Sequence, residues 1–211
     1  VNCVVISING TIGDVQIPSK TSDVLDWIRK KYKNSEFQFQ GKIQDSINYA
    51  QRIQTSILPD NSLIRQHLPK SFIYYTPRDV VSGDFPWFFR KNGITYIAAV
   101  DCTGHGVPGA FMSILAYNGL NKITSKNKNL HPAQILDRLH FHIRKLQHEG
   151  DGEFKEGMDI SLCSFDLKNN VLEFAGALNS ILLNLDGAFI ELPADRRSIA
   201  SSLQNKKDYY K

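Results

Sequence analysis

From residue 71 onward, short apolar runs bounded by turn residues alternate with two longer stretches whose apolar positions recur at helical spacing. The short runs predict strands, and the longer stretches predict helices over residues 107–124 and 131–147. Strands, then helices, then strands again indicate an α+β fold, a layered β-sandwich flanked by helices. The expected strands cover residues 71–76, 85–89, 95–100, 160–165, 171–174, 181–185 and 189–192.

The first 43 residues have a different pattern and predict a small N-terminal α/β unit. Residues 1–8 are β-branched and strand-like, and Asn9-Gly10 is a hairpin turn signal that would let residues 14–18 pair back onto them. A helix over residues 23–33, followed by a strand over residues 37–43, would complete the unit. This order resembles a clipped β-grasp module, for which an accessory role without chemistry is the simplest interpretation.

Residues 44–69 are expected to form a helical linker or switch segment between this unit and the domain over residues 70–211. Its apolar positions recur at spacings of four, three, three and four, which places them on one face of a helix. Two interpretations stay open: a helix packed on its own domain, or a signal-transmitting coiled coil that forms a homodimer through residues 43–57. The positions are Ile43, Ile47, Ala50, Ile53 and Ile57.

Composition narrows the class of protein. The chain has 211 residues, of which 42% are hydrophobic, and a formal charge of +4 from 25 basic and 21 acidic residues. It lacks the dense basic clusters of a nucleic-acid binder and any apolar run of the roughly 20 residues that a membrane span needs. Its three cysteines lie far apart without zinc-ligand spacing, which favours a reducing, cytoplasmic compartment.

Two carboxylates stand at places where a sheet could present them. Asp84 directly precedes the expected strand over residues 85–89. Asp101 ends the expected strand over residues 95–100 and is followed by a glycine-rich turn. Carboxylate and backbone carbonyl oxygens suit hard cations such as magnesium and manganese. Spacing alone favours a simpler interpretation in which both residues are caps, Asp84 of a turn and Asp101 of the following helix.

His105 lies between two glycines in the same turn. A histidine in this setting is commonly an ordinary loop residue. Beside a metal-binding carboxylate, however, it could donate a proton to a leaving alkoxide.

Six sequence blocks resemble bacterial SpoIIE-like phosphatases, a branch of the type 2C metal-dependent serine/threonine protein phosphatases. The resemblance covers roughly residues 44–200, and its most specific part is the run from Asp101 to Ser113. The blocks are SINYAQRIQ (46–54), ILP (57–59), VVSGDF (80–85), DCTGHGVPGAFMS (101–113), GMDI (157–160) and FAGA (174–177).

The resemblance implies a two-metal centre of magnesium or manganese at one edge of the sandwich. Asp101 would bridge both ions, the backbone carbonyl of Cys102 would bind one, and Asp84 would bind directly or through water. His105 matches a proposed general acid. Separately, Arg78 lies just upstream of Asp84, where it could hold the substrate phosphate or be an ordinary surface residue. Attack by a metal-activated water would be direct, so neither Cys102 nor Cys163 need be a nucleophile.

The sequence also departs from the family pattern. Pro86 stands where the family usually has an aromatic residue, and Ala200 replaces a common glycine. The family continues with further acidic metal ligands, whereas this chain stops at Lys211, so a C-terminally incomplete domain with a weak or absent second ion is expected. Asp159 lies in a block whose role is expected to be structural.

Two functions therefore remain open at the level of sequence. The first is hydrolysis of phosphoserine or phosphothreonine on a regulatory protein in bacterial signalling, for which relatives suggest an anti-sigma-factor antagonist. The second is a catalytically impaired, phosphatase-like module for binding or dimerisation. The initial Val1 also allows a processed, trimmed or fused chain.

Overall fold

The computed structural model describes residues 11–12, 15–16, 21–148, 156–200 and 210. The chain divides into two compact units, Val1–Tyr49 and Ala50–Lys211, and the boundary falls within one long helix, α1 (Thr21–Ile57). In the part of the chain that is described, no helix is long and apolar enough to cross a membrane.

The first unit contains a short antiparallel pair of strands and the beginning of α1. Strand β2 (Val15–Gln16) falls in the expected second strand, but its partner is β1 (Thr11–Ile12), next to it in the chain. The expected strand over residues 1–8 lies outside the described residues.

The expected strand over residues 37–43 is wrong, because these residues belong to α1. The alternating run from Phe37 to Gln40 is only four residues long, and so short a run does not distinguish a strand from part of a helix. Helix-forming sequence continues on both sides, so an unbroken hydrogen-bond ladder forms, and the one glycine, Gly41, costs it about 1 kcal/mol relative to alanine.

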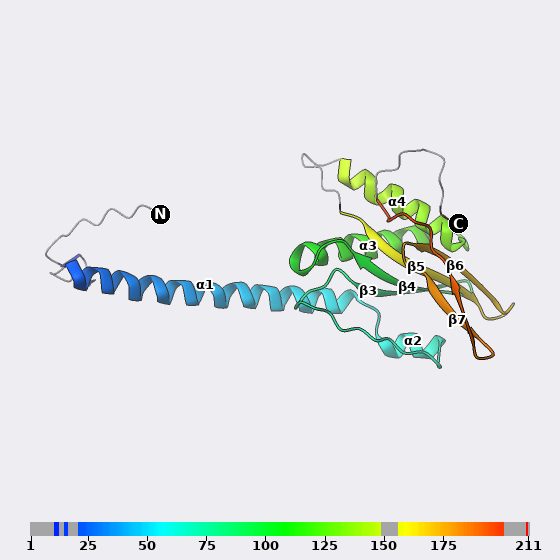
Figure 1. Cartoon of the computed structure of the whole chain (residues 1–211), viewed down its shortest axis with the longest axis horizontal. Coiled ribbons are helices and arrows are strands. Elements are labelled where there is room, and N and C mark those ends of the chain that lie inside the picture. Colours follow the sequence, from blue (N-terminus) through cyan, green and yellow to red (C-terminus); the bar gives the residue numbers. More distant parts are fainter. Residues whose placement is uncertain (1–10, 13–14, 17–20, 149–155, 201–209, 211) are drawn as a thin grey trace. The chain divides into compact units, whose positions relative to one another are not determined.

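The second unit is built on a four-stranded antiparallel sheet in the order β3-β4-β5-β6 (Figure 1). These strands are β3 (Phe85–Lys91), β4 (Ile94–Cys102), β5 (Met158–Asp166) and β6 (Val171–Ala177). A separate hairpin follows, made of β7 (Ile181–Leu185) and β8 (Ala188–Leu192). The expected α+β class and its mainly antiparallel strands are confirmed.

Two helices bury one face of this sheet. Helix α3 (Gly106–Lys126) and helix α4 (Pro132–His148) contribute Leu120 and Leu139 to the core, and the sheet contributes Ile160 and Leu162, all four fully buried. Because side chains alternate across a strand, the residues between the core positions face the other way, among them Asp101, between Val100 and Cys102. A third helix, α2 (Asn61–His67), follows α1.

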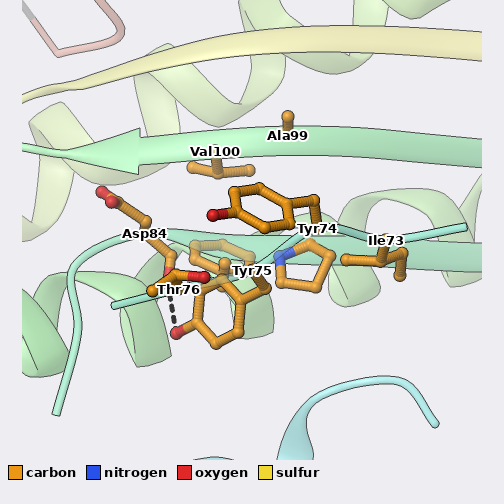
Figure 2. Close-up of a pocket in the computed structure, with 9 residues that line it drawn as sticks. Ile73, Tyr74, Tyr75, Thr76, Asp84, Ala99 and Val100 are labelled. Carbon is orange, nitrogen blue, oxygen red and sulfur yellow. Dashed lines mark hydrogen bonds between the residues drawn. The ribbon is translucent and has the colours of Figure 1, made fainter. Parts of the chain in front are cut away.

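The expected strand over residues 71–76 is also wrong, since these residues make no ladder in the structure. They run instead as an irregular segment beside β3 and β4. Figure 2 shows Ile73, Tyr74 and Tyr75 from this segment lining a pocket of about 350 Å³ with Asp84 at one end. Phe72 and Tyr74 of this segment are exposed, so these two rings contribute little burial that would hold it against the sheet.

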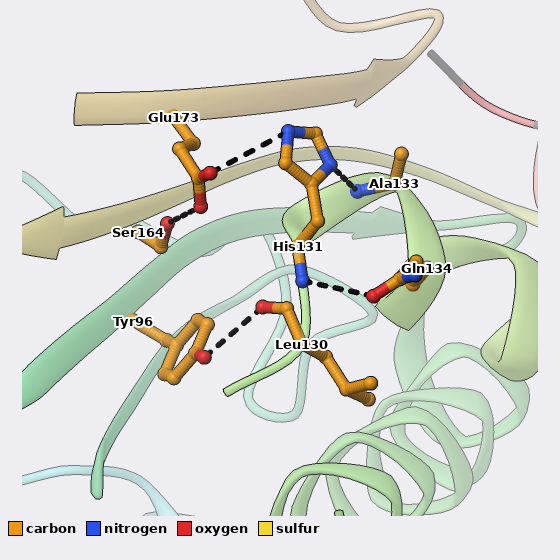
Figure 3. A network of polar contacts seen from close by, with 7 residues as sticks. All are labelled: Tyr96, Leu130, His131, Ala133, Gln134, Ser164 and Glu173. Atoms are coloured by element: carbon orange, nitrogen blue, oxygen red, sulfur yellow. Dashed lines mark hydrogen bonds and ion pairs between the residues drawn. The ribbon is translucent and has the colours of Figure 1, made fainter. Parts of the chain in front are cut away.

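The start of α4 is fixed to the sheet by polar contacts (Figure 3). The Tyr96 hydroxyl donates to the carbonyl of Leu130 at 3.0 Å, and the Ala133 amide donates to Nδ1 of His131 at 3.2 Å. Nε2 of His131 lies 3.9 Å from the carboxylate of Glu173 on β6. His131 therefore caps the helix and does not point toward Asp101.

Ala200 occupies a backbone conformation that explains why glycine is common at this position in the family. Its φ is 66°, in the left-handed region, where an alanine costs roughly 1–2 kcal/mol. The Ala200 amide is held there by donation to Nδ1 of buried His140 at 3.1 Å.

Shortening Leu162 to alanine should destabilise the second unit by about 2–5 kcal/mol, because this side chain is fully buried between the sheet and its helices. The same change at Leu167, which is 57% exposed, should have little effect. Urea unfolding of Leu162→Ala and Leu167→Ala measures the difference, and equal losses would contradict the described core.

Candidate metal and phosphoester site

Asp84 and Asp101 converge at the edge of the sheet. Strand β3 pairs with β4 so that Phe85 lies opposite Val100, which brings the preceding Asp84 beside Asp101. Partial burial, then a hydrogen bond that the protonated Asp101 donates to the Asp84 carboxylate, and then the negative charge of Asp84, raise the pKa of Asp101. A divalent cation would relieve this repulsion between two carboxylates.

Neither carboxylate has the capping role that spacing alone allowed. Asp101 is part of β4, and the N-cap of α3 is His105, whose side chain makes no capping hydrogen bond. The Asp84 amide donates to the hydroxyl of Ser82 at 3.0 Å, while its backbone carbonyl accepts from Tyr75 at 3.0 Å (Figure 2). These contacts hold the backbone of Asp84, and its carboxylate interacts with that of Asp101.

Backbone packing brings the two acidic segments together. A Cβ on Gly83 would lie 2.9 Å from the carbonyl oxygens of both Cys102 and Gly104, and one on Gly109 would lie 2.6 Å from the Gly104 oxygen. Such distances are too short for any side chain, so glycine is required at 83 and 109. The carbonyl of Cys102, the predicted backbone ligand, therefore lies beside the segment that carries Asp84.

Gln54 of α1 anchors the same segment, and sequence reasoning missed it. Its side-chain oxygen accepts from the Ser82 amide at 3.0 Å, and its nitrogen donates to the Ser82 carbonyl at 2.6 Å and to the Ser113 hydroxyl at 2.8 Å. Gln54 is only 4% exposed. A polar residue beside the apolar stripe of this helix was the available signal, because buried amides are kept where they have partners.

A pocket of about 330 Å³ opens over the two carboxylates. Arg78 and His105 line it together with Asp84 and Asp101, so the structure gathers all four side chains predicted for the site in one place. Asp79, which the sequence did not single out, lines the pocket as well and contacts His105 Nδ1 through its Oδ2 at 2.9 Å. The pocket therefore presents carboxylates that could bind a cation, with a guanidinium and an imidazole beside them.

The two described cysteines are not suited to nucleophilic attack. Burial, followed by the negative charge of Asp101, raises the pKa of the Cys102 thiol far above its ordinary value. Burial raises the pKa of Cys163 to about 11. Since the thiolate is the reactive form, both stay protonated near neutral pH.

A third carboxylate lies close by. Asp159 on β5 is opposite Asp101 in the ladder, and its Oδ1 accepts a hydrogen bond from Ser198. Among the described residues, however, no group of three or more Asp, Glu, His and Cys side chains is arranged to hold a metal ion. Two carboxylates and the Cys102 carbonyl therefore fit one hard cation whose remaining positions water would fill.

The structure is similar to the SiaA-PP2C domain of Pseudomonas aeruginosa, with 37% identity and a TM-score of 0.68, over 76% of this chain and 63% of that one. A stage II sporulation E family protein from Thermanaerovibrio acidaminovorans is similar over 51% of this chain and 52% of that one, with 15% identity and a TM-score of 0.42. RsbX in complex with magnesium is similar over 62% of this chain and 58% of that one, with 15% identity and a TM-score of 0.44. These two are too distant to support an inference. No curated protein matches the sequence.

The antiparallel α+β fold is similar to that of a PP2C domain. The model of the stage II sporulation protein E (SpoIIE) family matches residues 91–199. The chain belongs to the SpoIIE family, and it spans 63% of the length of the SiaA-PP2C domain.

Replacing Gln54 with alanine should lower the free energy of unfolding of the second unit by about 1–3 kcal/mol, because the amide and carbonyl of Ser82 lose their partner. Gln51→Ala is the matched control, since Gln51 is exposed on the same helix. Chemical denaturation of both variants provides the test. Equal stability of the two would show that the Gln54 contacts contribute nothing.

Proposed function

We propose that this chain hydrolyses phosphoserine or phosphothreonine esters on a regulatory protein, with one divalent cation held by Asp84, Asp101 and the backbone carbonyl of Cys102. The observation that supports the proposal most strongly is the convergence of Asp84 and Asp101 at the edge of the sheet; burial and then the neighbouring Asp84 raise the pKa of Asp101. Oxygen-only donors favour magnesium or manganese. When bound, such a cation supplies an activated water and positive charge at the phosphate.

The remaining side chains of the pocket have roles that follow from their charge. Arg78 is exposed at the rim and would hold the phosphate oxygens through its guanidinium. His105 would protonate the leaving alkoxide of serine or threonine. The thiols of Cys102 and Cys163 take no part, and no phosphoenzyme forms.

The substrate we propose is a phosphorylated regulatory protein of a bacterial signalling pathway, of the anti-sigma-factor-antagonist kind. An open pocket supports a protein substrate, because a phosphorylated side chain on a protein surface must reach the cation. The exposed Tyr74 lines a pocket together with Asp84 and offers apolar contact area for such a surface (Figure 2). Nucleic acid is not proposed as a partner, since the charge of +4 is small and dispersed.

A binding and dimerisation role is the second candidate. Ile43 and Ile53 of the apolar stripe on α1 are 45% and 47% exposed, so this face of the helix is available for a second copy of the chain. Dimerisation through residues 43–57 is compatible with catalysis. A module that only binds would instead dimerise without turnover.

Asp101→Asn should reduce manganese- or magnesium-dependent hydrolysis of a phosphoserine peptide by at least about a hundredfold, the loss typical of removing one electrostatic stabiliser. Asp186→Asn is the matched control, because Asp186 is exposed in a turn with a φ of 53°, which asparagine tolerates. Steady-state kinetics on both variants provide the measurement. Unchanged turnover in Asp101→Asn would remove its proposed role, and no turnover by the unmodified chain would favour the binding module.

A further inference from the structure

Asp79 and His105 come from different segments and meet at the pocket over the two carboxylates. Asp79 precedes β3, and His105 lies 26 residues later, between β4 and α3. Their contact joins Asp79 Oδ2 to Nδ1 of the imidazole at 2.9 Å. Both residues line the pocket that contains Asp84 and Asp101.

This contact determines which nitrogen of His105 can act. With Nδ1 held by a carboxylate, Nε2 is the nitrogen that can reach a substrate, and the ring is fixed in one orientation. The His105 side chain is 71% exposed and makes no capping bond to α3, so it is not committed to the helix. A lone exposed histidine would rotate freely, and the contact with Asp79 removes that freedom.

The contact between Asp79 and His105 lies at the surface of the pocket. The pair is too exposed to contribute much to stability, since the side chains are 71% and 37% exposed.

We propose that Asp79 is a positioning residue for phosphoester hydrolysis: it holds Nδ1 of His105 so that Nε2 donates its proton to the leaving oxygen. The inference rests on the proposed function and assigns it a further residue. Water forms a new bond to phosphorus as the bond between phosphorus and the ester oxygen breaks, and the phosphoryl group leaves as inorganic phosphate. The ester oxygen takes both electrons of the broken bond and the Nε2 proton, which gives a neutral alcohol, and the attacking water releases a proton to solvent. The imidazole is left neutral and regains a proton from solvent.

The substrate's leaving group separates this role from a structural one. The alkoxide of serine is a poor leaving group and needs protonation, whereas 4-nitrophenolate leaves readily without it. Asp79→Asn should therefore lower kcat about tenfold or more for a phosphoserine peptide, with a much smaller loss for 4-nitrophenyl phosphate and little change in KM. His105→Gln should show the same selectivity, and the double variant should lose little more. Asp186→Asn should match the unmodified chain on both substrates.

A measurement on the metal-free protein tests the pair without turnover. Long-range proton–nitrogen NMR spectra, with the His105 signals identified by their loss in His105→Gln, should show a protonated Nδ1 in the unmodified chain and its loss in Asp79→Asn. Identical His105 spectra in the two proteins, or equal losses of kcat on both substrates, would overturn the inference. If the unmodified chain turned over neither substrate, the proposed function would fail, and the proton-donor role with it, even if the spectra showed the pair.

Discussion

The site depends on one close approach between backbones, that of Gly83 to the carbonyls of Cys102 and Gly104. Any side chain at position 83 would meet both oxygens at 2.9 Å, so the segment carrying Asp84 could no longer lie against the end of β4. The sheet register positions Asp101, but this contact brings Asp84 to it. Gln54 then fixes the segment through both polar groups of the Ser82 backbone.

From this arrangement the chemistry follows by electrostatics. Partial burial and then the neighbouring Asp84 carboxylate raise the pKa of Asp101, and a cation would stabilise the two charged carboxylates. Around it lie a guanidinium and an imidazole, suited to a phosphate and to its leaving group respectively. The helix face of the sheet is closed by a fully buried core, and Asp101 faces away from it at the end of β4.

Much of the fold could be predicted from the sequence, because β3 to β8 and both covering helices have strong patterns and clear turn residues. The strand expected over residues 37–43 failed because a four-residue alternation competes poorly with helical sequence on both sides. At the site, Asp84, Asp101 and His105 were predicted from their motif. Gln54 and Asp79 were not, because their contacts are with residues 28 and 26 positions away in sequence, and no local pattern encodes such contacts.

The central claim is that Asp84 and Asp101 together hold a divalent cation. Isothermal titration of manganese into the unmodified chain, Asp84→Asn and Asp186→Asn tests it most directly. The account predicts that the unmodified chain and Asp186→Asn bind with equal affinity, while Asp84→Asn binds at least about tenfold more weakly because it loses a charged ligand. Equal manganese affinity in all three proteins would contradict it.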